Sequence, residues 1–233
     1  MTDVTFPASH GDLRAYLARP QGDGPWPGVI VINDILGMTR DLRDHSDWFA
    51  QRGFLALAPD LYSWGSKIAC LRATFRDLRA GRGRAFDDIE ASKVWLAGRQ
   101  DCTDRVGIVG FCMGGGFALL MAPTGSFDVS APNYGEVPDD PVDVLAGSCP
   151  VVASFGAKDR TLRGAAAKLE SALDTLGVEH DVKEYPDVGH SFMNKIGNRV
   201  LQVVAGAGGL GFDEAATEDA RARILTYFRT HLA

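Results

Sequence analysis

The stretch RVGIVGFCMGGGFALL, residues 105–120, decides the fold that we predict for this chain. A short β-branched run leads through the pattern G-x-C-x-G, centred on Cys112, into an apolar run that suits a helix. This layout is typical of a nucleophile elbow, here with cysteine where serine is usual. Gly110 and Gly114 leave room around a strained residue, and the helix that follows directs its first N–H groups at the thiol. The stretch predicts Cys112 as a nucleophile and the N–H of Met113 as an oxyanion donor. A buried structural cysteine in a glycine-rich turn is the alternative for this pattern alone.

Length and composition narrow the class of protein. The chain has 233 residues, 45% hydrophobic and 23% charged, so we expect one globular domain over 1–233, as a monomer or a small homo-oligomer. The formal net charge of −6 argues against a nucleic-acid partner. We expect a cytoplasmic protein without a membrane partner, because the sequence shows neither an apolar run of spanning length nor a secretory signal. Its four cysteines are widely spaced, which favours neither a metal site nor a disulfide framework.

Short apolar runs alternate with segments of helical periodicity along the chain. We predict a hairpin at the edge of a sheet from strands at 4–6 and 13–18. The other predicted strands are 27–32, 54–58, 105–109, 129–134, 151–155 and 181–185. Helices are predicted at 41–52, 72–78, 86–96, 162–176 and 214–232. This alternation predicts an α/β fold with a mostly parallel central sheet and helices on both faces.

Two polar residues follow later strands of the predicted sheet. Asp159 follows the strand 151–155 in GAKDR, and His190 follows the strand 181–185 in DVGHSF. Because the carboxyl ends of parallel strands meet at one edge, both are expected to converge on Cys112. Taken singly, an Asp in a turn is usually a cap and a His in a loop is usually solvated. Together, the order nucleophile, acid, histidine after three separate strands predicts a catalytic triad.

With these motifs the chain resembles the dienelactone hydrolases, which are α/β-hydrolases with a cysteine nucleophile. The resemblance covers nearly the whole chain, through the motifs VIVINDILG, APDLY, GFCMGG, GAKD and GHSF. It implies the α/β-hydrolase fold, with Cys112 as nucleophile, His190 as general base and then acid, and Asp159 orienting His190.

The resemblance also implies the groups around the nucleophile. Asp34 stands where the family has a Glu that holds the resting thiol. The N–H groups of Ile35 and Met113 would form the oxyanion hole. The implied reaction is hydrolysis of a small-molecule lactone or carboxylic ester through a thioester on Cys112, without a cofactor or a metal.

The substrate pocket departs from the family pattern. Trp64 and Asn194 occupy the positions of two family arginines that clamp a substrate carboxylate. We expect a preference for neutral or weakly polar substrates, unless a cation such as Arg40, Arg72 or Arg76 has moved into the pocket. The expected lining residues are Leu36, Tyr62, Trp64, Tyr134 and Phe192; for the aromatics after APD, simple capping of the core is the alternative.

Two other classes of function stay open. A thiol acyltransferase or peptidase shares the nucleophile and the histidine and differs in what accepts the acyl group. A non-catalytic α/β-hydrolase binding module usually lacks a member of the triad, and this chain keeps all three. The glycine-rich segment 197–212 is either a flap over the site or a connection to the final helix, and we favour the connection.

Overall fold

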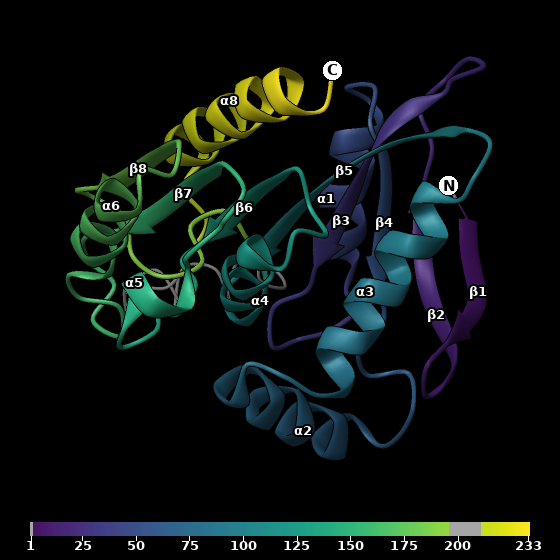
Figure 1. Cartoon of the computed structure of the whole chain (residues 1–233), viewed down its shortest axis with the longest axis horizontal. Helices are drawn as coiled ribbons and strands as arrows, with labels where there is room; N and C mark the ends of the chain where they lie inside the picture. Colours follow the sequence, from purple (N-terminus) through teal and green to yellow (C-terminus); the bar gives the residue numbers. More distant parts are fainter. Residues whose placement is uncertain (1, 196–210) are drawn as a thin grey trace.

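The apolar runs of the sequence form the middle of an eight-stranded sheet in the computed structural model, which describes residues 2–195 and 211–233 (Figure 1). The order across the sheet is β1-β2-β4-β3-β5-β6-β7-β8. The β1–β2 and β2–β4 pairs are antiparallel and the other neighbours are parallel. The expected parallel sheet with an edge hairpin is therefore confirmed. The strands are β1 (Thr2–Ala8), β2 (Gly11–Ala18), β3 (Trp26–Ile32), β4 (Leu55–Pro59), β5 (Cys102–Phe111), β6 (Val129–Asn133), β7 (Val151–Gly156) and β8 (His180–Tyr185).

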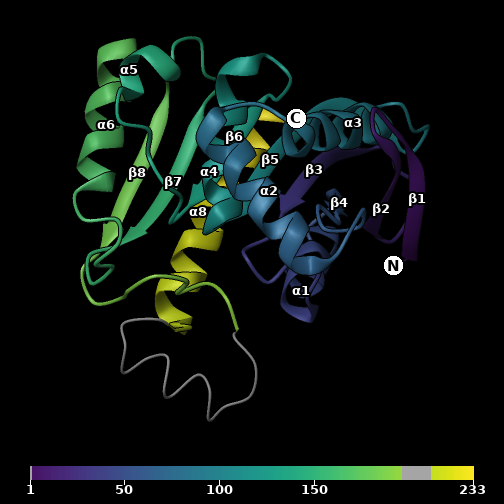
Figure 2. The same ribbon diagram turned by 90° about the horizontal axis from the view of Figure 1, so that it is seen from below.

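Helices cover both faces of the sheet, and in Figure 2 β1 and β8 lie at its opposite ends. One hydrophobic cluster joins the sheet to α1 and α8, and two others join it to α2, α3, α4 and α6 on the other face. The helices of the described residues are α1 (Arg40–Ala50), α2 (Lys67–Ala80), α3 (Arg84–Ala97), α4 (Met113–Met121), the 3-10 turn η1 (Ala122–Thr124), α5 (Pro141–Val144), α6 (Ala165–Leu176) and α8 (Glu214–His231).

Strand β3 shows why the central strands read as continuous apolar runs. Val29 and Val31 belong to the cluster under α1 and α8, whereas Ile30 and Ile32 belong to the cluster under α3 and α4. All four side chains are fully buried. Since both faces of this strand are covered, both of its alternating sets of side chains must be apolar.

Helix α2 begins five residues before its predicted start at 72, and α4 begins within the glycine run after Cys112. Helix α2 begins at Lys67, where Ser66 caps it by accepting a hydrogen bond from Ala69 N. Helix α4 begins at Met113, directly after Cys112, so three glycines lie in its first turns. Glycine disfavours a helix interior, but here it allows close backbone contacts that a side chain would block, as described below. The short elements η1 and α5 were not expected.

The last helix is capped by Asp213, whose Oδ1 accepts a hydrogen bond from Ala216 N at 2.8 Å. Of the glycine-rich segment 197–212, residues 197–210 lie outside the described residues. Within residues 2–195 and 211–233, no helix is long and apolar enough to cross a membrane.

The parallel strands bring the candidate residues to one edge of the sheet. Cys112 directly follows β5, and Asp34 lies two residues after the end of β3. Asp159 and His190 lie in the loops that follow β7 and β8. All four therefore lie beyond the carboxyl ends of parallel strands, where open α/β sheets place their sites.

Candidate active site

Cys112 has a backbone conformation that few non-glycine residues adopt. Its φ is 56° and its ψ is −118°, between the end of β5 and the first residue of α4. Its N–H donates to the carbonyl of Asn133 at 3.1 Å, and its own carbonyl accepts from Gly116 N at 3.2 Å. These bonds hold the strained turn, which places the thiol at the amino end of α4 as the elbow pattern predicts.

The glycines of the elbow are required by contacts between backbones. A β-carbon on Gly110 would overlap the carbonyl oxygen of Gly114. One on Gly114 would lie 2.5 Å from the carbonyl oxygen of Ile32, and one on Gly115 would lie 2.5 Å from that of Asn133. The first turn of α4 thus touches the ends of β3 and β6 directly. This contact brings the loop that contains Asp34 and Ile35 beside Cys112.

Asp159 and His190 form a close pair. His190 Nδ1 and Asp159 Oδ2 are 2.5 Å apart, and the Asp159 residue is only 3% exposed. The other oxygen, Oδ1, accepts hydrogen bonds from Thr161 N at 2.8 Å and Thr161 Oγ1 at 2.6 Å. Burial raises the pKa of Asp159, but the hydrogen bonds from His190 and Thr161 outweigh it and hold this pKa below its ordinary value. Asp159 is therefore the anionic partner of the His190 ring.

His190 also lies close enough to Cys112 for this residue to raise the pKa of its ring. Burial lowers the pKa of His190, whereas the hydrogen bonds with Asp159 and Cys112 and their negative charges raise it more strongly, to about 9. Charge-assisted hydrogen bonds thus outweigh desolvation here. The arrangement favours a protonated imidazole beside Cys112.

Asp34 is engaged within its own loop. Its Oδ1 accepts the N–H of Leu36 at 2.8 Å, and burial raises its pKa although this hydrogen bond opposes the rise. Ile35 lies next in the chain and is 43% exposed. Met113 is the first residue of α4, where a backbone N–H has no partner within the helix. Both backbone donors proposed for the oxyanion hole therefore lie at the edge of the sheet where Cys112 lies.

The expected pocket residues fall into two groups. Leu36 and Trp64 are 39% and 36% exposed. Tyr62, Tyr134 and Phe192 are buried. The ring of Tyr134 packs edge-on against both His190 and Phe192, with centroids 5.4 and 5.3 Å away, so Tyr134 supports the histidine ring and Phe192 supports Tyr134. The hydroxyl of Tyr62 lies 3.4 Å from the carbonyl oxygen of Ile35, beneath the β3–α1 loop.

Asn194 is buried and links segments that are distant in the sequence. Its Oδ1 accepts a hydrogen bond from the hydroxyl of Tyr134, and its Nδ2 donates to Asp41 Oδ2 at 2.9 Å. Asp41 Oδ1 also accepts the N–H of Lys195 at 3.0 Å. The segment after His190 is thus fastened to the amino end of α1. The sequence analysis did not identify Asp41, since nothing local marks a contact across 153 positions.

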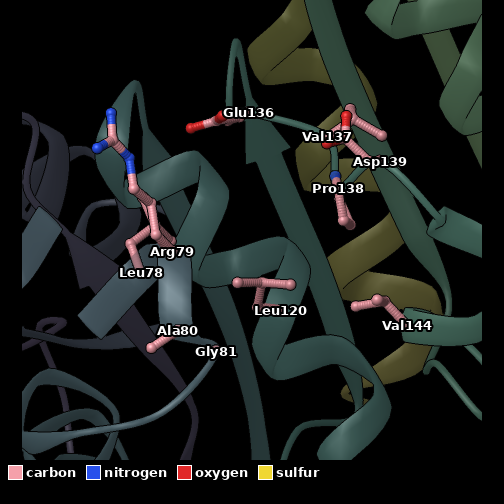
Figure 3. A pocket seen from close by; sticks show the side chains of 10 residues that line it. All are labelled: Leu78, Arg79, Ala80, Gly81, Leu120, Glu136, Val137, Pro138, Asp139 and Val144. Atoms are coloured by element: carbon pink, nitrogen blue, oxygen red, sulfur yellow. The ribbon is translucent and has the colours of Figure 1, made fainter. Parts of the chain in front are cut away.

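The cations considered for the pocket lie on outer surfaces. Arg40 is 93% exposed, and Arg72 and Arg76 line a groove along the outer side of α2. A separate pocket of about 410 Å³ lies between the end of α2, Leu120 of α4 and the loop after β6 (Figure 3). Its lining residues include none of the candidate site residues. Among the described residues, no group of three or more His, Cys, Asp or Glu side chains could hold a metal ion.

Comparison with known proteins agrees with this geometry. A model described as the "Dienelactone hydrolase family" matches residues 13–232. A "Putative carboxymethylenebutenolidase" of Azospirillum brasilense is 29% identical over 245 residues, covering 100% of both chains. One of Yersinia pestis is 28% identical over 207 residues, covering 82% of this chain and 78% of that protein. The crystal structure of a "Putative Dienelactone Hydrolase" from Klebsiella pneumoniae has a TM-score of 0.79 at 26% identity, covering 98% of this chain and 97% of that one.

The mostly parallel sheet, the elbow and the strand-end residues define an α/β-hydrolase. The chain belongs to the dienelactone hydrolase family, and it is a hydrolase that acts on ester bonds, lactones included. The resemblance noted in the sequence is thereby confirmed.

The contact between Gly110 and Gly114 can be tested by adding one methyl group. We expect Gly110→Ala to lower the free energy of unfolding by about 3 kcal/mol, because the new β-carbon must displace backbone rather than a flexible side chain. Urea denaturation measures this change. Gly65→Ala is the matched control, since its β-carbon would meet only Cys70 Sγ at 3.4 Å. Equal stability of the two variants would contradict the close packing described for the elbow.

The pKa of His190 is the second measurable quantity. We expect NMR titration of the His190 ring to give about 9 in the wild type, and a lower value in Asp159→Asn, which removes the negative charge. Because this folded-state pKa lies above the ordinary 6.5, the linked stabilisation is fully present below about pH 6.5 and is lost as pH rises through 9. A wild-type pKa at or below 6.5 would mean that burial outweighs the hydrogen bonds.

Proposed function

We propose that this enzyme hydrolyses a small-molecule lactone or carboxylic ester through a thioester on Cys112. The observation that carries this proposal is the close Asp159–His190 pair, with Cys112 near enough to raise the pKa of His190. Cys112 also stands at the amino end of a helix in a strained turn, a setting that favours thiolate. In this scheme His190 transfers protons, and Asp159 holds the imidazole in place and compensates its charge.

The proposed reaction has two halves. In the first, the Cys112 thiolate forms a C–S bond to the substrate carbonyl carbon, and the carbonyl electron pair moves onto oxygen as an oxyanion. Collapse of this intermediate breaks the C–O bond, and His190 gives its proton to the departing alkoxide or enolate. In the second, His190 takes a proton from water as the water oxygen attacks the thioester. The C–S bond then breaks, releasing the acid and restoring the thiolate and protonated His190.

The exposed side chains in and near the loop that contains Ile35 favour the binding of an apolar, uncharged substrate. Ile35, Leu36 and Trp64 are the large apolar side chains exposed there. Trp64 lies two residues after Tyr62, whose hydroxyl contacts the carbonyl of Ile35, so the two loops are neighbours. A substrate that presents an alkyl or aromatic group would cover this apolar surface.

The groups at the two family arginine positions do not offer a free cation. The amide of Asn194 is already bonded to Tyr134 and Asp41. The ring of Trp64 is covered by the guanidinium of Arg84 at 4.8 Å, and Arg84 itself pairs with buried Asp88. A buried substrate carboxylate needs a charge-assisted partner, and these contacts supply none.

The role of Cys112 is tested by removing its thiol. We expect Cys112→Ala to abolish hydrolysis of p-nitrophenyl acetate while the fold survives, since deleting one sulfur at a turn removes little packing. Cys112→Ser should keep only a small residual rate, because a hydroxyl ionises far less readily than a thiol.

Chemical labelling provides an independent measure of the same residue. Mass spectrometry after iodoacetamide treatment should find Cys112 modified before the other three cysteines. Cys102 and Cys149 are matched controls within the chain, because burial raises their pKa values to about 11 and about 12. Substantial hydrolysis by Cys112→Ala would refute the proposed mechanism.

Substrate charge is tested with a dienelactone and its methyl ester. We expect the neutral ester to have the higher kcat/KM, because the free acid would bury a carboxylate without a cationic partner. Steady-state kinetics at one pH and one ionic strength give both values. If the free acid were tenfold better, about 1.4 kcal/mol of transition-state preference, a cation must reach the substrate and this interpretation of the site is wrong.

A further inference from the structure

Asn33 is a buried amide at the point where β3 leaves the sheet. Its residue is 1% exposed, and its Nδ2 donates a 2.6 Å hydrogen bond to the carbonyl oxygen of Asp34. That carbonyl belongs to the same peptide group as the N–H of Ile35. The side chain of Asn33 therefore contacts the peptide whose N–H is proposed as an oxyanion donor.

Peptide geometry links the two ends of this group. Among the described residues, the single cis peptide is Gly24–Pro25, so the Asp34–Ile35 peptide is trans. In a planar trans peptide the C=O and the N–H point in opposite directions. With the Asp34 carbonyl held against the buried amide of Asn33, the N–H of Ile35 points away from Asn33. Rotation of this peptide would break the bond to Asn33 and the longer bond, 3.2 Å, that the same carbonyl accepts from Gly37 N.

The following peptide is held as well. Its carbonyl, from Ile35, accepts from the hydroxyl of Tyr62 at 3.4 Å, and its N–H, from Leu36, donates to Asp34 Oδ1 at 2.8 Å. None of the residues in 2–195 and 211–233 accepts a hydrogen bond from the N–H of Ile35. Both peptides around Ile35 are thus held in one orientation.

The amide of Asn33 has a cost for the fold. Its Oδ1 is buried and has no hydrogen-bond partner in the described part of the chain. An unpaired buried acceptor is unfavourable, and an apolar residue of similar size would avoid it. If Asn33 only filled space at the end of β3, an apolar side chain would serve better. The hydrogen bond that Asn33 Nδ2 donates to the Asp34 carbonyl explains why a polar side chain is found at this position.

We propose that Asn33 is a positioning residue, which orients the Asp34–Ile35 peptide so that the Ile35 N–H meets the substrate oxyanion. This inference rests on the proposed thioester mechanism. It assigns Asn33 no contact with the substrate. Its effect passes through one hydrogen bond to the Asp34 carbonyl.

The test compares two reactions of the same thiol. Hydrolysis of p-nitrophenyl acetate passes through oxyanions in both halves of the mechanism, whereas alkylation by iodoacetamide displaces iodide and forms no oxyanion. We expect Asn33→Leu, which keeps the volume and removes the donor, to lower kcat about 100-fold, as loss of an oxyanion donor does. KM and the alkylation rate of Cys112 should stay within about threefold of wild type. Asn33→Ala should behave in the same way.

Ser92→Ala is the control for loss of a buried polar group away from the site. Ser92 is fully buried in α3, and its hydroxyl donates to the carbonyl of Asp88 at 2.6 Å. We expect this variant to lose thermal stability and to keep its kcat, which separates destabilisation from loss of orientation.

Two results would overturn the role of Asn33. One is a wild-type kcat in Asn33→Leu; a loss of kcat in Asn33→Ala alone would then indicate a role in packing. The other is an equal fall of kcat and alkylation rate, which would mean that Asn33 supports the nucleophile or the fold in general. Failure of the thioester mechanism is recognised separately, by hydrolysis that survives Cys112→Ala.

Discussion

The site depends on one steric constraint, which is that the first turn of α4 lies directly against backbone carbonyls of neighbouring strands. Carbonyl oxygens of Ile32 and Asn133 occupy the space where β-carbons of Gly114 and Gly115 would lie. The nucleophile, the end of β3 and the end of β6 are therefore joined through main chain rather than through side chains. Main-chain contacts of this kind leave few alternative arrangements, because no rotamer can relieve them. The position of the Cys112 thiol is therefore fixed by main-chain contacts and does not depend on the other catalytic side chains.

Two opposing effects determine the charges in the site. Burial favours the neutral forms, and hydrogen bonds favour the charged forms. Burial alone would favour neutral forms of both Asp159 and His190. The hydrogen bonds from Thr161 and His190 instead stabilise the Asp159 carboxylate, and the hydrogen bond with Asp159 and the proximity of Cys112 stabilise the charged imidazole. The negative charge of Asp159 favours the protonated form of His190, and the bond from His190 in turn favours the carboxylate form of Asp159. Asp159 and His190 thus hold opposite charges in a partly buried site, which is the behaviour of a coupled pair.

The features that the sequence predicted correctly are those with local signals. The central strands are continuous apolar runs because both faces are covered, and the order of strands and helices follows from their alternation. The elbow could be recognised because Gly110 and Gly114 must flank Cys112 at fixed spacing. Asp159 and His190 could be placed near it because each follows a parallel strand.

The features that the sequence did not show depend on packing between distant segments. An aromatic residue in a loop can line a pocket or cover the core, and only tertiary contacts show that Tyr134 and Phe192 are buried and that Tyr134 packs against His190. The glycines in the first turn of α4 have low helix propensity, and only contacts with other strands show why they are required there. Asp41 meets Asn194 across the fold without any motif that joins them.

The tie at Asn194 has a consequence for how specificity can change in this enzyme. Its oxygen accepts from Tyr134 and its nitrogen donates to Asp41, so the residue must be both an acceptor and a donor. Arginine has only donors, and at this position it would leave the Tyr134 hydroxyl without its acceptor while adding a positive charge. Residue 194 can therefore either bind a negatively charged group of the substrate or link the loop after His190 to α1, but it cannot do both. A lineage that acquired an arginine there would have to rebuild the contact between the β6 end and α1, so the two pocket types are separated by a concerted change rather than by a single substitution.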